Sequence, residues 1–130
     1  MFIWDFLIDI FQNATYLNKN KIIQVLSQLS KEEYYIDIEY IILDLNFFNI
    51  LELFLDENND LYSIYYTFDL LLYFSLNLNE ISFRNKKSVI NVIDESGLIN
   101  KLESLVDECN EWLEEYIMII VNELKKYIDA

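Results

Sequence analysis

The chain has 130 residues, of which 54% are hydrophobic and 16% aromatic, so we expect one folded domain rather than a disordered segment. Its 23 acidic and nine basic residues leave a formal net charge of -14, which argues against binding to bare nucleic acid and favours a basic partner. The absence of His and the presence of a single Cys, Cys109, exclude nearly every zinc, haem and iron-sulfur site and all Ser-His or Cys-His catalysis.

Residues that form tight turns are scarce, and this favours long helices. The sequence has no Pro and only one Gly, Gly97, so sandwiches, barrels and glycine-rich phosphate loops are disfavoured.

The first ten residues carry acids inside an apolar run and no basic region, so we expect no signal peptide. The apolar stretches are too short, or are interrupted by Asp69, to cross a bilayer. We therefore expect an intracellular, all-α protein without a membrane partner.

The N-terminal third of the chain has the periodicity of amphipathic helices. Apolar residues recur at three- and four-residue steps over residues 2–14, which predicts a first helix. A second helix is expected over residues 19–29, with Asn18 as its N-cap. Ser30 and Glu33 have the spacing of a capping box, which predicts that a third helix begins there and runs to about Leu43.

The remainder of the chain predicts five more helices. Asn46 begins a short helix that ends at the polar cluster 56–60, and a long helix follows to about Leu76. This long helix is apolar on nearly all sides, so we expect it at the centre of the domain. A polar connector over residues 77–87 contains the only concentrated positive charge, Arg84-Asn-Lys-Lys, and the last three helices are expected over 86–94, 98–106 and 110–127.

An internal repeat relates two of these regions. Residues 49–65 align without a gap with residues 100–116, and seven of the seventeen aligned positions are identical, among them Tyr65 and Tyr116. The offset is 51 residues, and removal of the insertion after Leu76 brings it close to the ~40 to 47 residues of a three-helix armadillo unit. The short, medium and long order of the predicted helices agrees with such a unit.

From Ile41 to about Tyr127 the chain resembles the last two armadillo repeats of the importin-alpha family. The clearest stretch is residues 95–110, where five residues fall in step with the family's closing pattern: Gly97, Lys101, Glu103, Leu105 and Asn110. The resemblance implies an all-α armadillo/HEAT-like helical repeat stack, a fragment of an α-α superhelix, that forms one domain over residues 1–130. Within it, residues 1–45 would be a divergent first repeat, 46–85 a second repeat with an insertion at 77–87, and 86–130 a C-terminal capping repeat.

The resemblance also implies where partners bind. In the family, Trp and Asn pairs on the third helices hold an extended Lys-rich peptide in a groove. The aligned positions here are Asp9 and Asn13, Phe68 and Leu72, and Ile119 and Glu123, so only the candidate groove residue Asn13 survives. The resemblance therefore implies the C-terminal end of a nuclear import adaptor, present in cytoplasm and nucleus, that docks a transport receptor. The candidate docking surface comprises Glu103, Asp107, Glu108, Asn110 and Glu111.

Other interpretations of the same residues stay open. The acidic run over 107–115 is typical of a solvated turn and helix start, and the tyrosines are typical of core side chains with a hydroxyl at the edge. The charge of -14 also fits a small acidic inhibitor that imitates nucleic acid, and the aromatic content fits a helical subunit of a larger complex. We expect no enzymatic activity, no cofactor and no metal, and the sequence makes no prediction of the oligomeric state.

Overall fold

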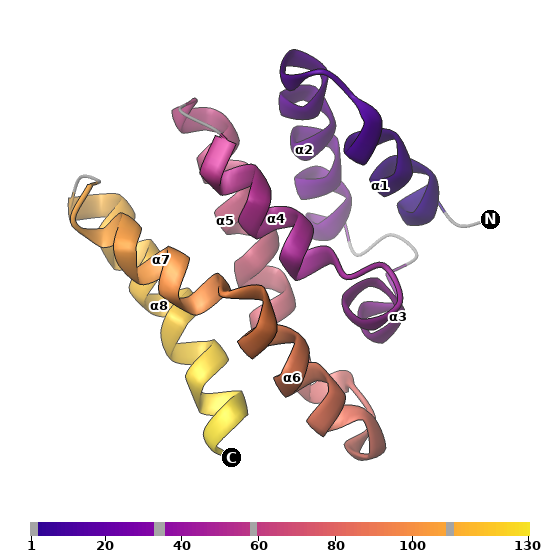
Figure 1. Ribbon diagram of the computed structural model, residues 1–130, viewed down its shortest axis with the longest axis vertical. Coiled ribbons are helices and arrows are strands. Elements are labelled where there is room, and N and C mark those ends of the chain that lie inside the picture. Colours follow the sequence, from indigo (N-terminus) through magenta and orange to yellow (C-terminus); the bar gives the residue numbers. More distant parts are fainter. Residues whose placement is uncertain (1–2, 33–35, 58–59, 109–110) are drawn as a thin grey trace.

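The computed structural model describes residues 3–32, 36–57, 60–108 and 111–130, and all regular elements within these ranges are helical (Figure 1). The α-helices of the described residues are α1 (Ile3–Asn13), α2 (Tyr16–Lys31), α3 (Ile38–Leu43), α4 (Phe47–Glu57), α5 (Leu61–Leu76), α6 (Lys86–Ser96), α7 (Leu98–Val106) and α8 (Glu111–Asp129). Two short 3-10 turns, η1 (Leu78–Glu80) and η2 (Phe83–Asn85), lie in the connector between α5 and α6. No helix in the described ranges has the length and apolar character needed to cross a membrane.

The helices predicted after residue 46 form close to their expected bounds. Asp60 is the N-cap of α5, and its carboxylate accepts hydrogen bonds from the Tyr62 amide at 3.2 Å and the Ser63 hydroxyl at 3.1 Å. Gly97 separates α6 from α7 in a left-handed conformation with φ of 71°, which glycine adopts at little cost. Caps at these positions therefore fix the boundaries that the sequence pattern indicates.

The N-terminal third differs from the sequence prediction. Thr15, not Asn18, caps α2, because its hydroxyl oxygen accepts a hydrogen bond from the Asn18 amide at 3.4 Å. The prediction that a third helix begins at Ser30 is wrong: Ser30 is buried inside α2, and its hydroxyl donates to the Ser27 carbonyl at 2.6 Å. Glu33, the other residue of the expected capping box, lies outside the described residues. The third helix, α3, begins only after the cap Asp37.

The long helix α5 lies at the centre, as its apolar sequence predicts. It packs against α2 on one side and α8 on the other, so that these three helices form a row (Figure 1). A second set of contacts joins α4 to α7 and α3 to α6. The buried residues of α5 include Phe68, Leu70, Leu71 and Phe74. Because α1 packs on α2 and α7 packs on α8, helices α1 and α2 lie at one end of the row and helices α7 and α8 lie at the other.

Aromatic rings join α1, α4 and α5 in the core. The ring centroid of Phe74 lies 6.1 Å from that of Trp4, 5.7 Å from that of Phe47 and 6.4 Å from that of Phe48, each in an edge-to-face arrangement. Phe11 and Phe54 form a second contact between α1 and α4, with centroids 5.1 Å apart. Such pairs contribute on the order of 1 kcal/mol beyond burial alone, so this cluster fixes α1 against the central helix.

Candidate functional site

Three of the predicted docking residues lie at the turn between α7 and α8, whereas the fourth that the structure describes, Glu103, lies one turn earlier on α7. Glu103 lies on α7, Asp107 and Glu108 lie in the turn, and Glu111 begins α8; all four are exposed. Asn110 lies outside the described residues. Glu103 forms an ion pair with Lys125 of α8, with 3.4 Å between the carboxylate oxygen and Nζ. Three acidic side chains thus surround this turn with little basic charge beside them.

Helix ends account for part of this acidic cluster. Asp107 is the C-cap of α7, and the Glu108 amide donates to the Leu105 carbonyl at 3.1 Å, so the chain leaves α7 in a tight turn. Glu111 and Glu114 lie in the first turn of α8, where carboxylates are stabilised by the positive end of the helix dipole. The acids therefore do not by themselves indicate a ligand.

An exposed aromatic group beside the acidic turn was missed by the sequence analysis. Trp112 in α8 keeps 57% of its surface exposed, and its ring stacks on Tyr65 of α5 with centroids 5.4 Å apart and an interplanar angle of 16°. Tyr116, one turn later in α8, meets both rings edge-on at 5.9 and 6.2 Å. We call these three residues the aromatic surface. The internal repeat is the sequence signal that relates two members of this surface, because it aligns Tyr65 with Tyr116. The structure places these two rings in contact.

Tyr116 is held in place by a polar group at the centre of the row. Its hydroxyl donates to the Asp69 carboxylate of α5, which also lies 3.1 Å from the Lys31 ammonium of α2 and accepts from the Ser27 hydroxyl at 3.5 Å. Burial, together with the bond to Asp69, raises the pKa of Tyr116 well above its usual value. The bond to Asp69 also raises the pKa of Lys31. One carboxylate thus links α2, α5 and α8 and fixes the orientation of the aromatic surface.

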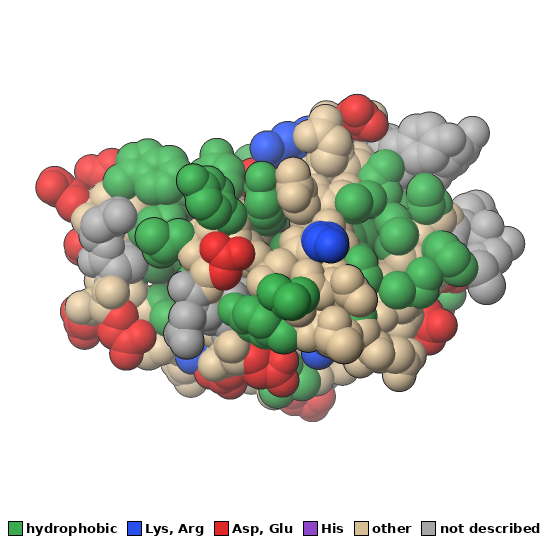
Figure 2. All heavy atoms as spheres, turned by 90° about the horizontal axis from the view of Figure 1, so that it is seen from above, with side chains coloured by type: hydrophobic (Ala, Val, Ile, Leu, Met, Phe, Trp, Pro, Cys, Tyr) green, Lys and Arg blue, Asp and Glu red, His purple; other side chains and the backbone are tan. Residues whose placement is uncertain are grey.

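The charges around the α7–α8 end of the row are visible in Figure 2. At the left of that view, where Figure 1 places α7 and α8, hydrophobic side chains lie directly beside acidic ones. The few Lys and Arg side chains on this face lie farther toward the middle. An aromatic face next to carboxylates is suited to cationic groups, because the ring quadrupole and the negative charges attract the same partner.

The groove residues implied by the family resemblance do not share one surface. Asn13 is exposed at the end of α1, where its side-chain amide donates to the Asp9 carbonyl of the same helix at 3.0 Å. Phe68 is buried in the core and cannot line a groove. Ile119 is exposed on α8, and Glu123 lines a pocket at the far end of that helix. The described residues therefore offer no continuous Trp and Asn ladder.

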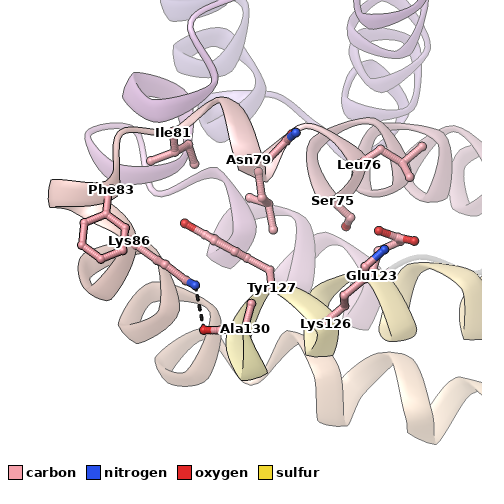
Figure 3. A pocket seen from close by; sticks show the side chains of 11 residues that line it. Ser75, Leu76, Asn79, Ile81, Phe83, Lys86, Glu123, Lys126, Tyr127 and Ala130 are labelled. Carbon is pink, nitrogen blue, oxygen red and sulfur yellow. Dashed lines mark hydrogen bonds between the residues drawn. The ribbon is translucent and has the colours of Figure 1, made fainter.

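That pocket lies between the end of α5, the connector and the end of α8 (Figure 3). It has a volume of about 540 Å³ and is open to solvent. Lys86 donates from Nζ to the Ala130 carbonyl at 2.9 Å and lies 5.4 Å from the centroid of the Tyr127 ring. Its two lysines, Lys86 and Lys126, share the lining with Glu123. The pocket thus combines charges of both signs with apolar walls, and no single ligand chemistry follows from it.

Within the described ranges, no three His, Cys, Asp or Glu side chains are grouped so as to hold a metal ion. Comparison of the chain with models of known protein families, with curated proteins and with solved structures found no match. The function is therefore argued from the residues themselves.

Proposed function

We propose that the chain is a protein-binding module, built as an armadillo-type helical repeat stack, that docks a basic protein partner at the α7–α8 end. The docking surface consists of Asp107, Glu108 and Glu111 together with the aromatic surface. The repeat architecture is supported by the row of α2, α5 and α8. It is also supported by the contact of α4 with α7, which accompanies the contact of α5 with α8. It is supported further by the repeat-related pair Tyr65 and Tyr116, whose rings are in contact.

The exposed ring of Trp112 is the observation that carries this proposal. A Trp side chain that leaves more than half of its surface in water forgoes a large hydrophobic stabilisation, and Trp is enriched among residues that dominate binding interfaces. Stacking on Tyr65 fixes the ring before a partner arrives, so binding immobilises little additional side-chain freedom. The pattern is typical of an interface residue rather than of a surface residue without a role.

The chemistry of the surface favours Arg in the partner. A guanidinium stacks on an indole face and can at the same time donate two hydrogen bonds to a carboxylate, which an ammonium cannot do. A cation over an exposed aromatic ring contributes about 0.5 to 1 kcal/mol, and each exposed ion pair a similar amount or less. Several such contacts are therefore needed for micromolar affinity, which fits a protein surface better than a single side chain.

The cellular role that we propose rests on the family resemblance over residues 95–110. A module of this kind would form the C-terminal end of a nuclear import adaptor and would move between cytoplasm and nucleus. Its docking partner would be a transport receptor that presents basic residues to the α7–α8 end. No catalytic group is required for this function.

A selection from a random library of 15-residue peptides displayed on phage tests the proposal. We expect the chain to enrich Arg-containing peptides of net positive charge, and we expect Trp112→Ala to abolish their binding. Ile119→Ala is the matched control, because Ile119 is also exposed on α8, by 52%, yet lies outside the docking surface. Enrichment of neutral or acidic peptides, or binding that survives Trp112→Ala, would show that the docking surface is wrongly assigned.

A further inference from the structure

The internal repeat relates three consecutive helices to the three that follow them. At the offset of 51 residues, α3 corresponds to the middle of α6, α4 to α7, and α5 to α8. Phe47 begins α4, and Leu98, at the same offset, begins α7. Each helix of the first set also packs against its counterpart: α3 against α6, α4 against α7 and α5 against α8. The α3–α5 unit therefore reveals which side chains receive the unit that follows it.

Three side-chain contacts join the α3–α5 unit to the α6–α8 unit. One is an ion pair and two are ring contacts, and they connect Asp56 with Lys101, Tyr65 with Trp112, and Phe68 with Tyr116. The ion pair lies between α4 and α7, and the ring contacts lie between α5 and α8. A lysine on one helix and two aromatic side chains on the next thus cover this face of the α3–α5 unit.

The corresponding side chains of the α6–α8 unit are open to solvent to a greater degree. At the offset of 51 residues, Asp56 corresponds to Asp107, Tyr65 to Tyr116, and Phe68 to Ile119. Asp107 is exposed and Tyr116 is partly exposed. Ile119 is 52% exposed, whereas Phe68 is 1% exposed. The three positions therefore keep an acid, a tyrosine and a large apolar side chain on a face that the described helices leave open.

We propose that the partner binds as a further helical pair, which packs on α7 and α8 as these two helices pack on α4 and α5. This inference rests on the proposed function, because the partner is the basic protein that docks at the α7–α8 end. One helix of the partner presents a Lys to Asp107, in the place that Lys101 takes beside Asp56. The other helix presents aromatic side chains to Tyr116 and Ile119. The lysine agrees with the positive charge that the docking surface attracts.

These requirements favour a different protein over a second copy of this chain. In a second copy, the pair that carries the lysine and the aromatic side chains is α7 and α8, and it already packs on α4 and α5. Release of this pair would expose buried side chains of both units, Phe68 and Ile117 among them. Two copies also repel each other, because each carries a net charge of -14, whereas a basic helical pair is attracted.

An extended chain tests whether this face accepts a helical pair. Residues 80–130 span one offset of 51, so a second copy of them joined after Ala130 continues the repeat without a gap. We expect the added helices to pack on α7 and α8. The extended chain should then keep the fractional helicity of the parent chain in circular dichroism and unfold at a higher urea concentration. The measurement is made with enough salt to screen the added negative charge.

Two sets of variants identify the contacts. Ile119→Asp in the first copy places a charge under the added helices, so we expect the urea midpoint to fall to that of the parent chain. The same substitution in the added copy is the matched control, because its side chain is exposed there and the midpoint should not change. Asp107→Lys in the first copy should lower the folding equilibrium constant by roughly fivefold. Lys101→Glu in the added copy should restore it, because the charges of the pair are then reversed.

An extension that stays unfolded, or a midpoint that Ile119→Asp in the first copy leaves unchanged, would overturn the inference. A parent chain that dimerises in sedimentation equilibrium, and that becomes monomeric in Ile119→Asp, would assign the face to a second copy instead. The proposed function fails differently, because it requires Arg-containing peptides whose binding is lost in Trp112→Ala. Ile119 lies outside the docking surface, so peptides that still bind Ile119→Asp, together with an unfolded extension, would refute the helical pair alone.

Discussion

Replacing Asp69 by Ala is expected to lower the free energy of unfolding by about 2 to 3 kcal/mol. The Asp69 side chain is only 9% exposed, and its carboxylate serves groups on two neighbouring helices. Lys31 is half-exposed, so water can replace its ion pair, and that loss contributes at most about 1 kcal/mol. The larger part is the bond from the half-buried Tyr116 hydroxyl, because a hydrogen bond to a charged acceptor is worth about 1.5 to 3 kcal/mol.

A double-mutant cycle with Tyr116→Phe separates this bond from the other effects. The single change Tyr116→Phe should cost about 1.5 kcal/mol, because it removes the hydroxyl and retains the ring contacts. The double variant should be no less stable than Asp69→Ala alone, since the hydroxyl then has no carboxylate to lose. This corresponds to a coupling energy of about 1.5 kcal/mol between the two residues.

Urea denaturation followed by far-ultraviolet circular dichroism measures these free energies. Asp94→Ala is the matched control, because Asp94 is exposed on α6 and its change should stay within about 0.5 kcal/mol. Additive effects of Asp69→Ala and Tyr116→Phe would refute the conclusion that this carboxylate links the three helices of the row.

Three further expectations concern pH, one glycine and the peptide groove. The pKa values of Tyr116 and Lys31 are raised in the folded chain. Their contribution to stability is therefore complete below about pH 10 and is lost as the pH rises further. Urea titrations at several pH values should show a shallower alkaline loss of stability in Tyr116→Phe than in the wild type. Gly97→Ala should cost about 1 kcal/mol of unfolding free energy, because φ is 71° there, while no atom lies within 4 Å of the added Cβ. An extended Lys-only peptide should show no saturable binding below about 1 mM in calorimetry, because the Trp and Asn ladder is missing; micromolar binding, unchanged by Asn13→Ala, would point to a groove elsewhere on the chain.

The sequence predicts helix bounds best where a capping side chain or a glycine lies between two apolar periodic segments. Asp60 and Gly97 lie between apolar periodic segments, and the start of α5, the end of α6 and the start of α7 follow from them. Ser30 illustrates the opposite case. Its spacing to Glu33 is that of a capping box, but the Ser30 hydroxyl bonds to the Ser27 carbonyl, one turn earlier in the same helix. A local pattern cannot decide between these two uses of one hydroxyl.

The candidate site was predictable in its charge but not in its aromatic part. The acids around Asp107 stand out by sequence because they cluster between two periodic segments. The exposure of Trp112 depends on the packing of α5 beside α8, which places Tyr65 under the indole ring. The position of Phe68 shows the same dependence: alignment with a family motif assigns it to a groove, whereas the packing of three helices buries it.

Titration of an Arg-rich peptide from the selection, followed by tryptophan fluorescence, tests the proposed docking surface most directly. Trp4 is buried in the core and Trp112 is exposed, so a change in emission reports on the docking surface. We expect a saturable change with a micromolar dissociation constant that weakens as salt is added. The same affinity, measured by calorimetry, should be retained in Ile119→Ala and lost in Trp112→Ala. Saturable binding that leaves the emission unchanged and persists in Trp112→Ala would contradict the proposal.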